Sequence, residues 1–176
     1  KESFTNLNPY LPFEKEISAE LKLGEENIIE VLLDSREIDG IPPFGGAVDY
    51  LVYGGIYREV FLTVHHKNYI KNIFAHSKNV LQEELTLTVE TSLNSMLEGS
   101  LVYKLYKGKN THKVEKPIFS NIRKIQGKVN KDTMKLKDIL LWDVESPNLY
   151  TLEVNLVDNK GKVVDNKLEI IGFREV

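Results

Sequence analysis

The feature that most constrains the fold is an alternation of apolar and polar side chains with a period of two. It is clearest in residues 85–93, where Leu85, Leu87 and Val89 are separated by threonines. Successive side chains of a β-strand point to opposite faces, so this pattern is typical of a strand that is buried on one side. Helical spacing of apolar residues is almost absent. The sequence therefore predicts an all-β protein.

The second half of the chain repeats this pattern. Apolar residues alternate from Tyr150 to Leu156, and the turn-forming residues 158–161 precede a new apolar pair at Val163, which predicts a hairpin. Further strands are expected at residues 69–75, 101–106, 112–118, 122–129 and 168–173. About seven short strands in about 110 residues are typical of an immunoglobulin-like β-sandwich.

The first part of the chain has a different texture. A stretch rich in glycine and proline, residues 35–48, predicts a long loop, and loops of that length are more often functional than connective. Strand candidates lie at residues 13–17, 28–33, 49–53 and 57–64. We place a domain boundary near residues 65–67, giving domains 1–66 and 67–176. Because the first buries only a small core, we expect it to be part of a larger domain.

Composition excludes several classes of partner. Lys and Arg total 23 against 26 Asp and Glu, a net charge of −3, with both signs mixed along the chain. No nucleic-acid partner is therefore expected. Apolar runs fall far short of the roughly 20 residues that cross a bilayer, so no membrane partner is expected. Cysteine is absent, which leaves the compartment open between the cytoplasm, which we favour, and a periplasmic or secreted location.

The titratable residues show no pattern of a metal or catalytic site. None of the four histidines has a metal-binding spacing, and we interpret them as surface residues: His65, His66, His76 and His112. The adjacent carboxylates Glu25-Glu26 and Glu83-Glu84 are interpreted as solvated charge. No nucleophile elbow or dinucleotide-binding glycine loop is present. We expect no metal and no cofactor.

Trp142, the single tryptophan, has two interpretations. An indole face suits the C–H face of a sugar ring, so Trp142 could stack on carbohydrate. Alternatively it closes one end of the sandwich beside Leu140 and Leu141, and we favour this packing role.

Several motifs resemble one family in the correct order. Residues 54–60, Gly-Gly-Ile-Tyr-Arg-Glu-Val, closely resemble the Gly-Gly-Ile-Tyr-Arg-Asp-Val signature of glycoside hydrolase family 2, the β-galactosidase, β-glucuronidase and β-mannosidase group. Residues 10–14 and 23–29 resemble two earlier landmarks of that family. The later landmarks correspond to Trp142, Pro147 and Tyr150, followed by Gly172, Phe173 and Arg174.

The resemblance implies an architecture. Residues 1–66 would be the end of a jelly-roll (galactose-binding-like) sugar-binding domain, and residues 67–176 the immunoglobulin-like domain. The catalytic barrel, with both catalytic glutamates, would begin just past Val176 and would be the natural partner of this chain. Retaining glycosidases need two carboxylates about 5 Å apart. We therefore expect the chain not to be an enzyme by itself.

The resemblance also suggests site residues. It places at Asp49 an aspartate that reaches toward the substrate subsite and an associated cation, with Tyr50 beside it; the alternative for Asp49 is loop capping. The glycines Gly54 and Gly55 permit positive φ and close backbone approach. Arg58, next to Tyr57, could offer a bidentate fork to a carboxylate, or could simply buttress the domain junction.

Three functions remain open. The leading hypothesis is a non-catalytic scaffold of a β-galactosidase-like glycosidase, in which loop 35–48 and Asp49 help to wall the sugar pocket. A second is an autonomous carbohydrate-binding module, suggested by Tyr50 and Tyr53. A third is an assembly domain, since unpaired strand edges could join copies into a homo-oligomer.

Overall fold

The chain divides into two compact units, residues 1–62 and 63–176. A computed structural model describes residues 4–8, 10–36, 40, 54–109 and 116–175. Within these ranges every regular element is a β-strand, and no described residue belongs to a helix that could span a bilayer.

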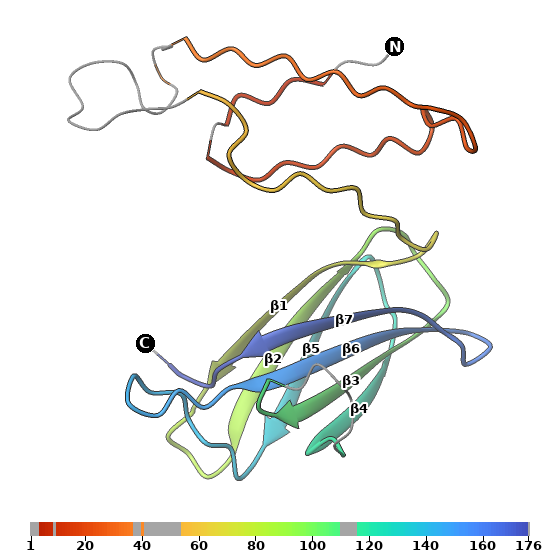
Figure 1. The fold of residues 1–176 in the computed structure, drawn as a ribbon. Coiled ribbons are helices and arrows are strands. Elements are labelled where there is room, and N and C mark those ends of the chain that lie inside the picture. The colour runs from red at the N-terminus through yellow and green to blue at the C-terminus, as the bar shows by residue number, and fades with distance from the viewer. Residues whose placement is uncertain (1–3, 9, 37–39, 41–53, 110–115, 176) are drawn as a thin grey trace, which may run out of the picture. The chain divides into compact units, whose positions relative to one another are not determined.

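The C-terminal unit is a β-sandwich of two antiparallel sheets (Figure 1). The three-stranded sheet has the order β1 (Ile70–Lys78), β2 (Leu85–Leu93) and β5 (Val129–Leu136). The four-stranded sheet has the order β4 (Phe119–Lys124), β3 (Gly99–Lys107), β6 (Tyr150–Asp158) and β7 (Val163–Ile171). The prediction of an all-β chain with about seven short strands after residue 67 is confirmed.

The predicted alternation builds the core of this unit. In β3 and β6 the inward residues lie opposite one another, Leu101 with Leu156 and Leu105 with Leu152, and each is at most 1% exposed. The inward leucines of β2 cover them from the other sheet. Burying each such side chain stabilises the fold by roughly 1.5–3 kcal/mol.

The predicted hairpin after Tyr150 is confirmed as β6 and β7. Its turn is closed by Asp158, whose carboxylate accepts hydrogen bonds from the N–H groups of Lys162 and Lys160, each at 2.9 Å. These bonds, that of Lys162 first, lower the pKa of Asp158. Gly161 completes the turn with a φ of 80°, a left-handed conformation that favours glycine.

Two strand predictions between these elements differ from the structure. Of the strand expected at residues 112–118, residues 116–118 form no strand and residues 112–115 lie outside the described part of the chain; β4 starts at Phe119. The single strand expected at residues 122–129 is two strands in different sheets, because β4 ends at Lys124 and β5 begins at Val129.

The reason lies in the inner face of β5. Asn130 pairs with the buried Thr91, and Asp132 pairs with the buried Val89, so both polar residues occupy inward positions. Hydropathy alternation is therefore hidden in the first half of this strand. Only Met134 and the residues after it carry the apolar signal.

In the N-terminal unit the strand predictions are wrong wherever residues are described. Residues 13–17, 28–33 and 57–62 form no strand, and residues 49–53 lie outside the described part. Large apolar side chains are exposed, Leu32 by 94% and Ile28 by 88%. A strand requires a neighbouring backbone to accept and donate its ladder hydrogen bonds. No ladder of this kind joins the described residues of this unit.

Candidate functional site

The two signature glycines occupy positions that require the absence of a β-carbon, Gly55 for its backbone conformation and Gly54 for a close contact. Gly55 has a φ of 119°, in the region that favours glycine. A β-carbon at Gly54 would lie 2.6 Å from the β-carbon of Ser35, closer than real atoms approach. These two positions therefore determine the path of the chain around Ser35.

The aromatic and basic residues of the signature contact each other. The guanidinium carbon of Arg58 lies 5.7 Å from the ring centroid of Tyr57, a cation–π distance, and Tyr57 is exposed. Among the described residues no carboxylate pairs with Arg58. The proposed fork to a carboxylate is thus not formed within this part of the chain, and the buttressing role stays a prediction.

The proposed substrate residues, Asp49 and Tyr50, lie outside the residues that the structure describes. The same holds for Tyr53 and for most of the predicted loop at residues 35–48. Their roles in a sugar pocket, and the alternative of loop capping, remain predictions.

The later landmarks converge on one place in the C-terminal unit. Trp142 forms an antiparallel bridge with Pro147. The backbone N–H of Trp142 donates a hydrogen bond to the carbonyl oxygen of Phe173 at 2.9 Å. A β-carbon at Gly172 would lie 3.0 Å from three side-chain carbons of Trp142. The indole thus packs directly on the glycine backbone, where a larger residue would displace it.

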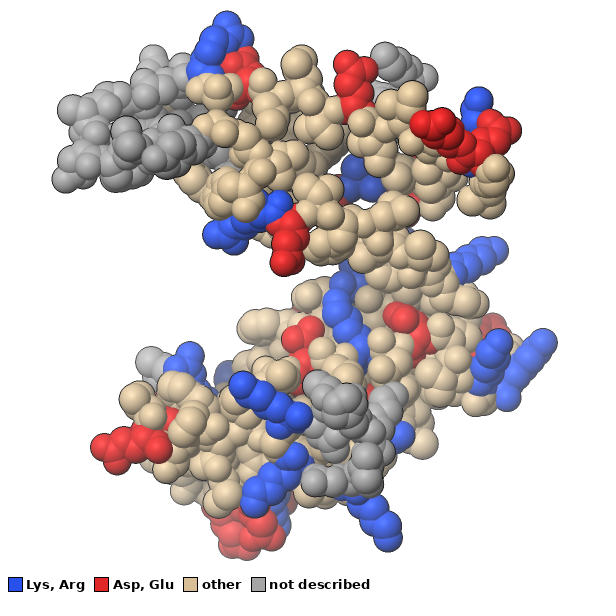
Figure 2. Space-filling model, in the orientation of Figure 1, with Lys and Arg blue, Asp and Glu red and all other residues tan. Residues whose placement is uncertain are grey.

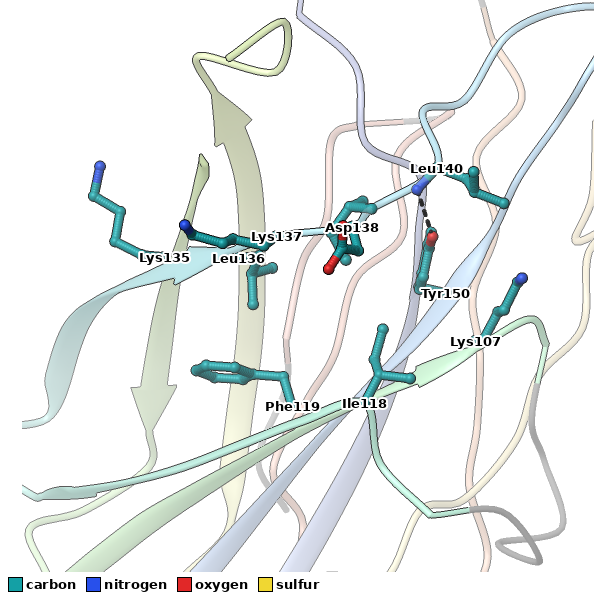
Figure 3. A pocket seen from close by; sticks show the side chains of 10 residues that line it. Lys107, Ile118, Phe119, Lys135, Leu136, Lys137, Asp138, Leu140 and Tyr150 are labelled. Carbon is teal, nitrogen blue, oxygen red and sulfur yellow. Dashed lines mark hydrogen bonds between the residues drawn. The ribbon is translucent and has the colours of Figure 1, made fainter. Parts of the chain in front are cut away.

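Further contacts extend this group. The guanidinium carbon of Arg174 lies 4.9 Å from the centroid of the Trp142 ring. The rings of Tyr150 and Phe173 meet edge to face at 5.1 Å, both buried, and the hydroxyl of Tyr150 accepts a hydrogen bond from the N–H of Leu140 at 2.8 Å (Figure 3). We call this group the landmark cluster: Trp142, Pro147, Tyr150, Gly172, Phe173 and Arg174. Trp142 is only half-buried, so it closes the end of the sandwich rather than lying inside its core.

The residues around the landmark cluster are also held against β1. Although β1 and β7 belong to different sheets, side chains join them along their length. The contacts pair residues in ascending order on both segments: Ile70 with Asp165, Lys71 with Lys167, Ser77 with Arg174 and Val80 with Glu175. β1 and β7 therefore run in the same direction on either side of a seam (Figure 1). The seam continues past β7 to residue 175.

A cavity of about 390 Å³ opens between the end of β5 and the facing ends of β3 and β4 (Figure 3). Lysines 107, 135 and 137 line it over an apolar floor that includes Phe119. Its lining has one carboxylate, Asp138. A retaining glycosidase needs two, about 5 Å apart. The residues around this cavity do not form that pair.

Three of the four histidines, His65, His66 and His76, are described, and His112 lies outside the described residues. His65 stacks on Tyr69 with ring centroids 4.2 Å apart, and His66 accepts a hydrogen bond from the N–H of Asn68. Within the described ranges, no three residues of the histidine and carboxylate types are placed to hold a metal ion. Charges of both signs are interspersed over the visible surface of each unit (Figure 2).

Sequence reasoning missed a set of buried polar contacts. The hydroxyl of Tyr103 donates to Asp132 Oδ2 at 2.6 Å, across the two sheets, and burial raises the pKa of that tyrosine, with the carboxylate adding to the shift. The hydroxyl of Tyr106 donates to Glu153 Oε2 at 2.8 Å, and burial followed by that bond raises its pKa to about 12. Alternation gave a signal only for Tyr103, which lies between the inward Leu101 and Leu105. It assigns Glu153, between Leu152 and Val154, to the outer face, yet Glu153 is 2% exposed.

Comparison with known proteins gives one consistent family. The sequence pattern of glycosyl hydrolases family 2 matches residues 68–174. The chain is 36% identical to a beta-galactosidase of Thermoanaerobacterium thermosulfurigenes over 94% of this chain and 24% of that protein. It is 30% identical to a beta-galactosidase of Thermoanaerobacter pseudethanolicus over 95% of this chain and 22% of that protein.

The structural comparison agrees. A Bacteroides fragilis protein assigned as a beta-galactosidase matches 91% of this chain and 25% of its own, with a TM-score of 0.74 and 26% identity. The chain thus spans about a quarter of the length of the relatives that it matches.

Proposed function

The chain belongs to glycosyl hydrolases family 2, and from that membership we propose that it is a non-catalytic supporting part of a glycosidase that hydrolyses O-glycosidic bonds, specifically a β-galactosidase. Three relatives with at least 30% identity over most of this chain, including those from Thermoanaerobacterium and Thermoanaerobacter, are beta-galactosidases. The chain corresponds to between 20% and 24% of each. We assign the catalytic carboxylates to the remaining part of the protein.

The landmark cluster is the observation that carries the supporting role. Residues 173–175 are held by three separate contacts, from Trp142, Ser77 and Val80. These contacts attach the residues after β7 to a sandwich with a buried apolar core. Such a block gives the residues that follow β7 a defined direction. Catalytic geometry depends on positioning to a fraction of an ångström, so a rigid support of this kind contributes to activity without touching substrate.

Asp49 and Tyr50 are proposed to reach the sugar pocket of the complete protein, together with loop 35–48. This assignment rests on the family resemblance around the signature at residues 54–60. The cation that the resemblance associates with the aspartate would belong to the complete active site. The carboxylate of Asp49 would either bind a sugar hydroxyl or hold that cation. No cofactor is needed for the hydrolysis itself.

A domain exchange tests the proposal. This chain would replace the matching segment of the Thermoanaerobacterium enzyme, and hydrolysis of a nitrophenyl β-galactoside would be measured. We expect the exchanged enzyme to be active and the 176-residue chain alone to be inactive. Hydrolysis by the chain alone, or a folded but inactive exchanged enzyme, would refute the supporting role.

Two further measurements separate the alternatives. In the exchanged enzyme, Asp49→Ala should raise KM or lower kcat with no loss of folding, whereas a loop-capping role would lower thermal stability and leave KM unchanged. Calorimetric titration of the chain alone with galactose at millimolar concentration should show no binding. A measurable affinity would favour an autonomous carbohydrate-binding module.

A further inference from the structure

A second cavity, of about 440 Å³, lies along the seam between β1 and the residues after β7. One wall is formed by residues 74–78, and the other by Gly172, Arg174 and Glu175. We call it the β1 groove. β1 is the outer strand of its sheet, so one of its edges has no neighbouring strand in that sheet. Such an edge offers backbone N–H and C=O groups to an added extended segment.

The wall of the β1 groove contains an unsatisfied polar atom. Nδ1 of His76 is buried and has no hydrogen-bond partner among the described residues. Its ring packs against Phe74, with centroids 5.6 Å apart. Native structures pair nearly all buried polar atoms, so an orphan of this kind indicates a missing partner. Because Nδ1 is closed to solvent, a ligand in the groove would reach it only if the His76 ring turned.

The charges around the groove indicate which partner fits. Lys78 and Arg174 are cationic, and among the described residues Arg174 has no ion pair. The single carboxylate, that of Glu175, already accepts a hydrogen bond from the N–H of Val80. Phe74 is 58% exposed and adds an apolar surface beside these charges. The groove therefore complements a segment that carries a carboxylate next to an apolar residue.

We propose that the β1 groove binds an extended, carboxylate-bearing segment of the catalytic part of the same protein. The carboxylate would contact Arg174 and Lys78 beside His76, while an apolar neighbour packs on Phe74. The proposal rests on the supporting function given above. It adds a specific contact surface for the catalytic part. Binding in the β1 groove would then help the landmark cluster to hold the residues after β7 in their direction.

The test uses the 176-residue chain and two synthetic probes. The acidic probe is acetyl-Asp-Leu-Glu-Val-amide, and its neutral twin replaces the two acids by Asn and Gln. Titration at millimolar concentration would be followed by proton–nitrogen NMR. We expect the acidic probe to shift the amide signals of residues 74–78 and 174 and the imidazole nitrogens of His76. The neutral twin should shift them far less.

Substitutions locate the binding. Lys78→Gln and Arg174→Gln should each weaken binding of the acidic probe by roughly twofold to fivefold. Because Arg174 also packs on Trp142, the exposed Lys78 provides the variant that leaves the fold intact. Lys131→Gln, on the far strand of the same sheet, is the matched control and should leave binding unchanged.

Equal shifts from both probes, shifts confined to other strands, or equal weakening by Lys131→Gln would overturn the proposal. The domain exchange is independent of this outcome. An active exchanged enzyme whose groove fails to bind the acidic probe would refute the groove and leave the supporting function intact. A groove that binds, in an exchanged enzyme that folds but is inactive, would refute the function instead.

Discussion

The two units differ in the burial of particular leucine side chains. Leu101 and Leu156 of the C-terminal unit are fully buried, whereas Leu23 and Leu32 of the N-terminal unit are 92% and 94% exposed. The C-terminal leucines lie in paired strands, β3 and β6. The N-terminal leucines lie in residues to which no strand is assigned. Apolar character alone therefore does not determine burial in this chain.

The difference teaches what converts a strand-like sequence into a strand. β2 lies between β1 and β5, and both of its edges are used by ladder hydrogen bonds. Residues 28–33 have a comparable apolar content but no ladder among the described residues. Pairing of the backbone removes the cost of burying its polar groups, and only then can a side chain enter the core.

Separating the units gives the largest expected effect. Residues 63–176 expressed alone should unfold in one cooperative urea transition, because their core and seam contacts lie within that range. Residues 1–62 alone should show no cooperative transition. Circular dichroism during denaturation measures both. A cooperative transition of residues 1–62 would contradict the comparison.

A matched pair of leucine truncations gives the next effect. Leu101→Ala should lower the free energy of unfolding by about 2–5 kcal/mol, since it leaves a cavity in the core. Leu32→Ala should change it by less than about 0.5 kcal/mol, because this side chain is in solvent. Urea denaturation of the full chain checks both values. Similar losses in the two variants would show that Leu32 is buried in solution.

Removing the hydroxyl of Tyr103, which bonds to Asp132 of the other sheet, should lower the free energy of unfolding by a smaller amount. Tyr103→Phe leaves the half-buried Asp132 without this donor and should cost about 1–3 kcal/mol. Tyr57→Phe is the exposed control and should cost nothing measurable. Thermal denaturation at neutral pH compares them.

The same tyrosine gives a pH dependence. Its pKa is raised in the folded state, so the unfolded chain ionises first, and the stability that it contributes is full below pH 10 and falls as the pH rises above 10. Tyr103→Phe should therefore lose stability less steeply in that alkaline range, the remaining loss belonging to Tyr106. An unchanged alkaline slope would contradict the assignment.

The smallest effect on the free energy of unfolding is expected from Arg36→Gln, on the surface of the N-terminal unit. Hydrogen bonding to Arg36, including a bond of 2.9 Å from its Nε, lowers the pKa of Asp34 to about 2. Arg36→Gln should return that pKa toward 3.8, as NMR titration of the carboxyl group would show. The free energy of unfolding should not change, because neighbours so close in sequence can pair in the unfolded chain as well. A large loss of stability would mean that this pair is part of a buried structure.

Much of the sandwich could be predicted from sequence because its strands carry apolar residues at every second position. The strand at residues 85–93 and the hairpin after Tyr150 were found with this signal. β5 was not, since Asn130 and Asp132 take inward positions. Asp132 accepts a hydrogen bond from Tyr103 of β3, and Asn130 bonds to Gln126 and Gly127 in the preceding loop. Alternation of hydropathy does not reveal a polar residue whose hydrogen bonds are supplied by the folded structure.

The candidate site, too, was predicted only in part from the sequence. The landmark residues were identified in order along the sequence, but their convergence around Trp142 depends on how the ends of the strands meet. The orphan Nδ1 of His76 was interpreted as part of a surface residue, and nothing in the spacing of the histidines distinguishes it. The ring of His76 contacts Phe74, a neighbour that only the folded strand brings beside it.

The sequence by itself determined the all-β class, the sandwich after residue 67 and the order of the family landmarks, because these depend on local periodicity and on motifs. The tertiary structure alone decided which apolar residues are buried, which polar residues face inward and which landmarks touch. Those properties depend on pairing between distant segments, such as β1 with the residues after β7. A strand pattern specifies what a segment can become, and its neighbours in space determine whether it does.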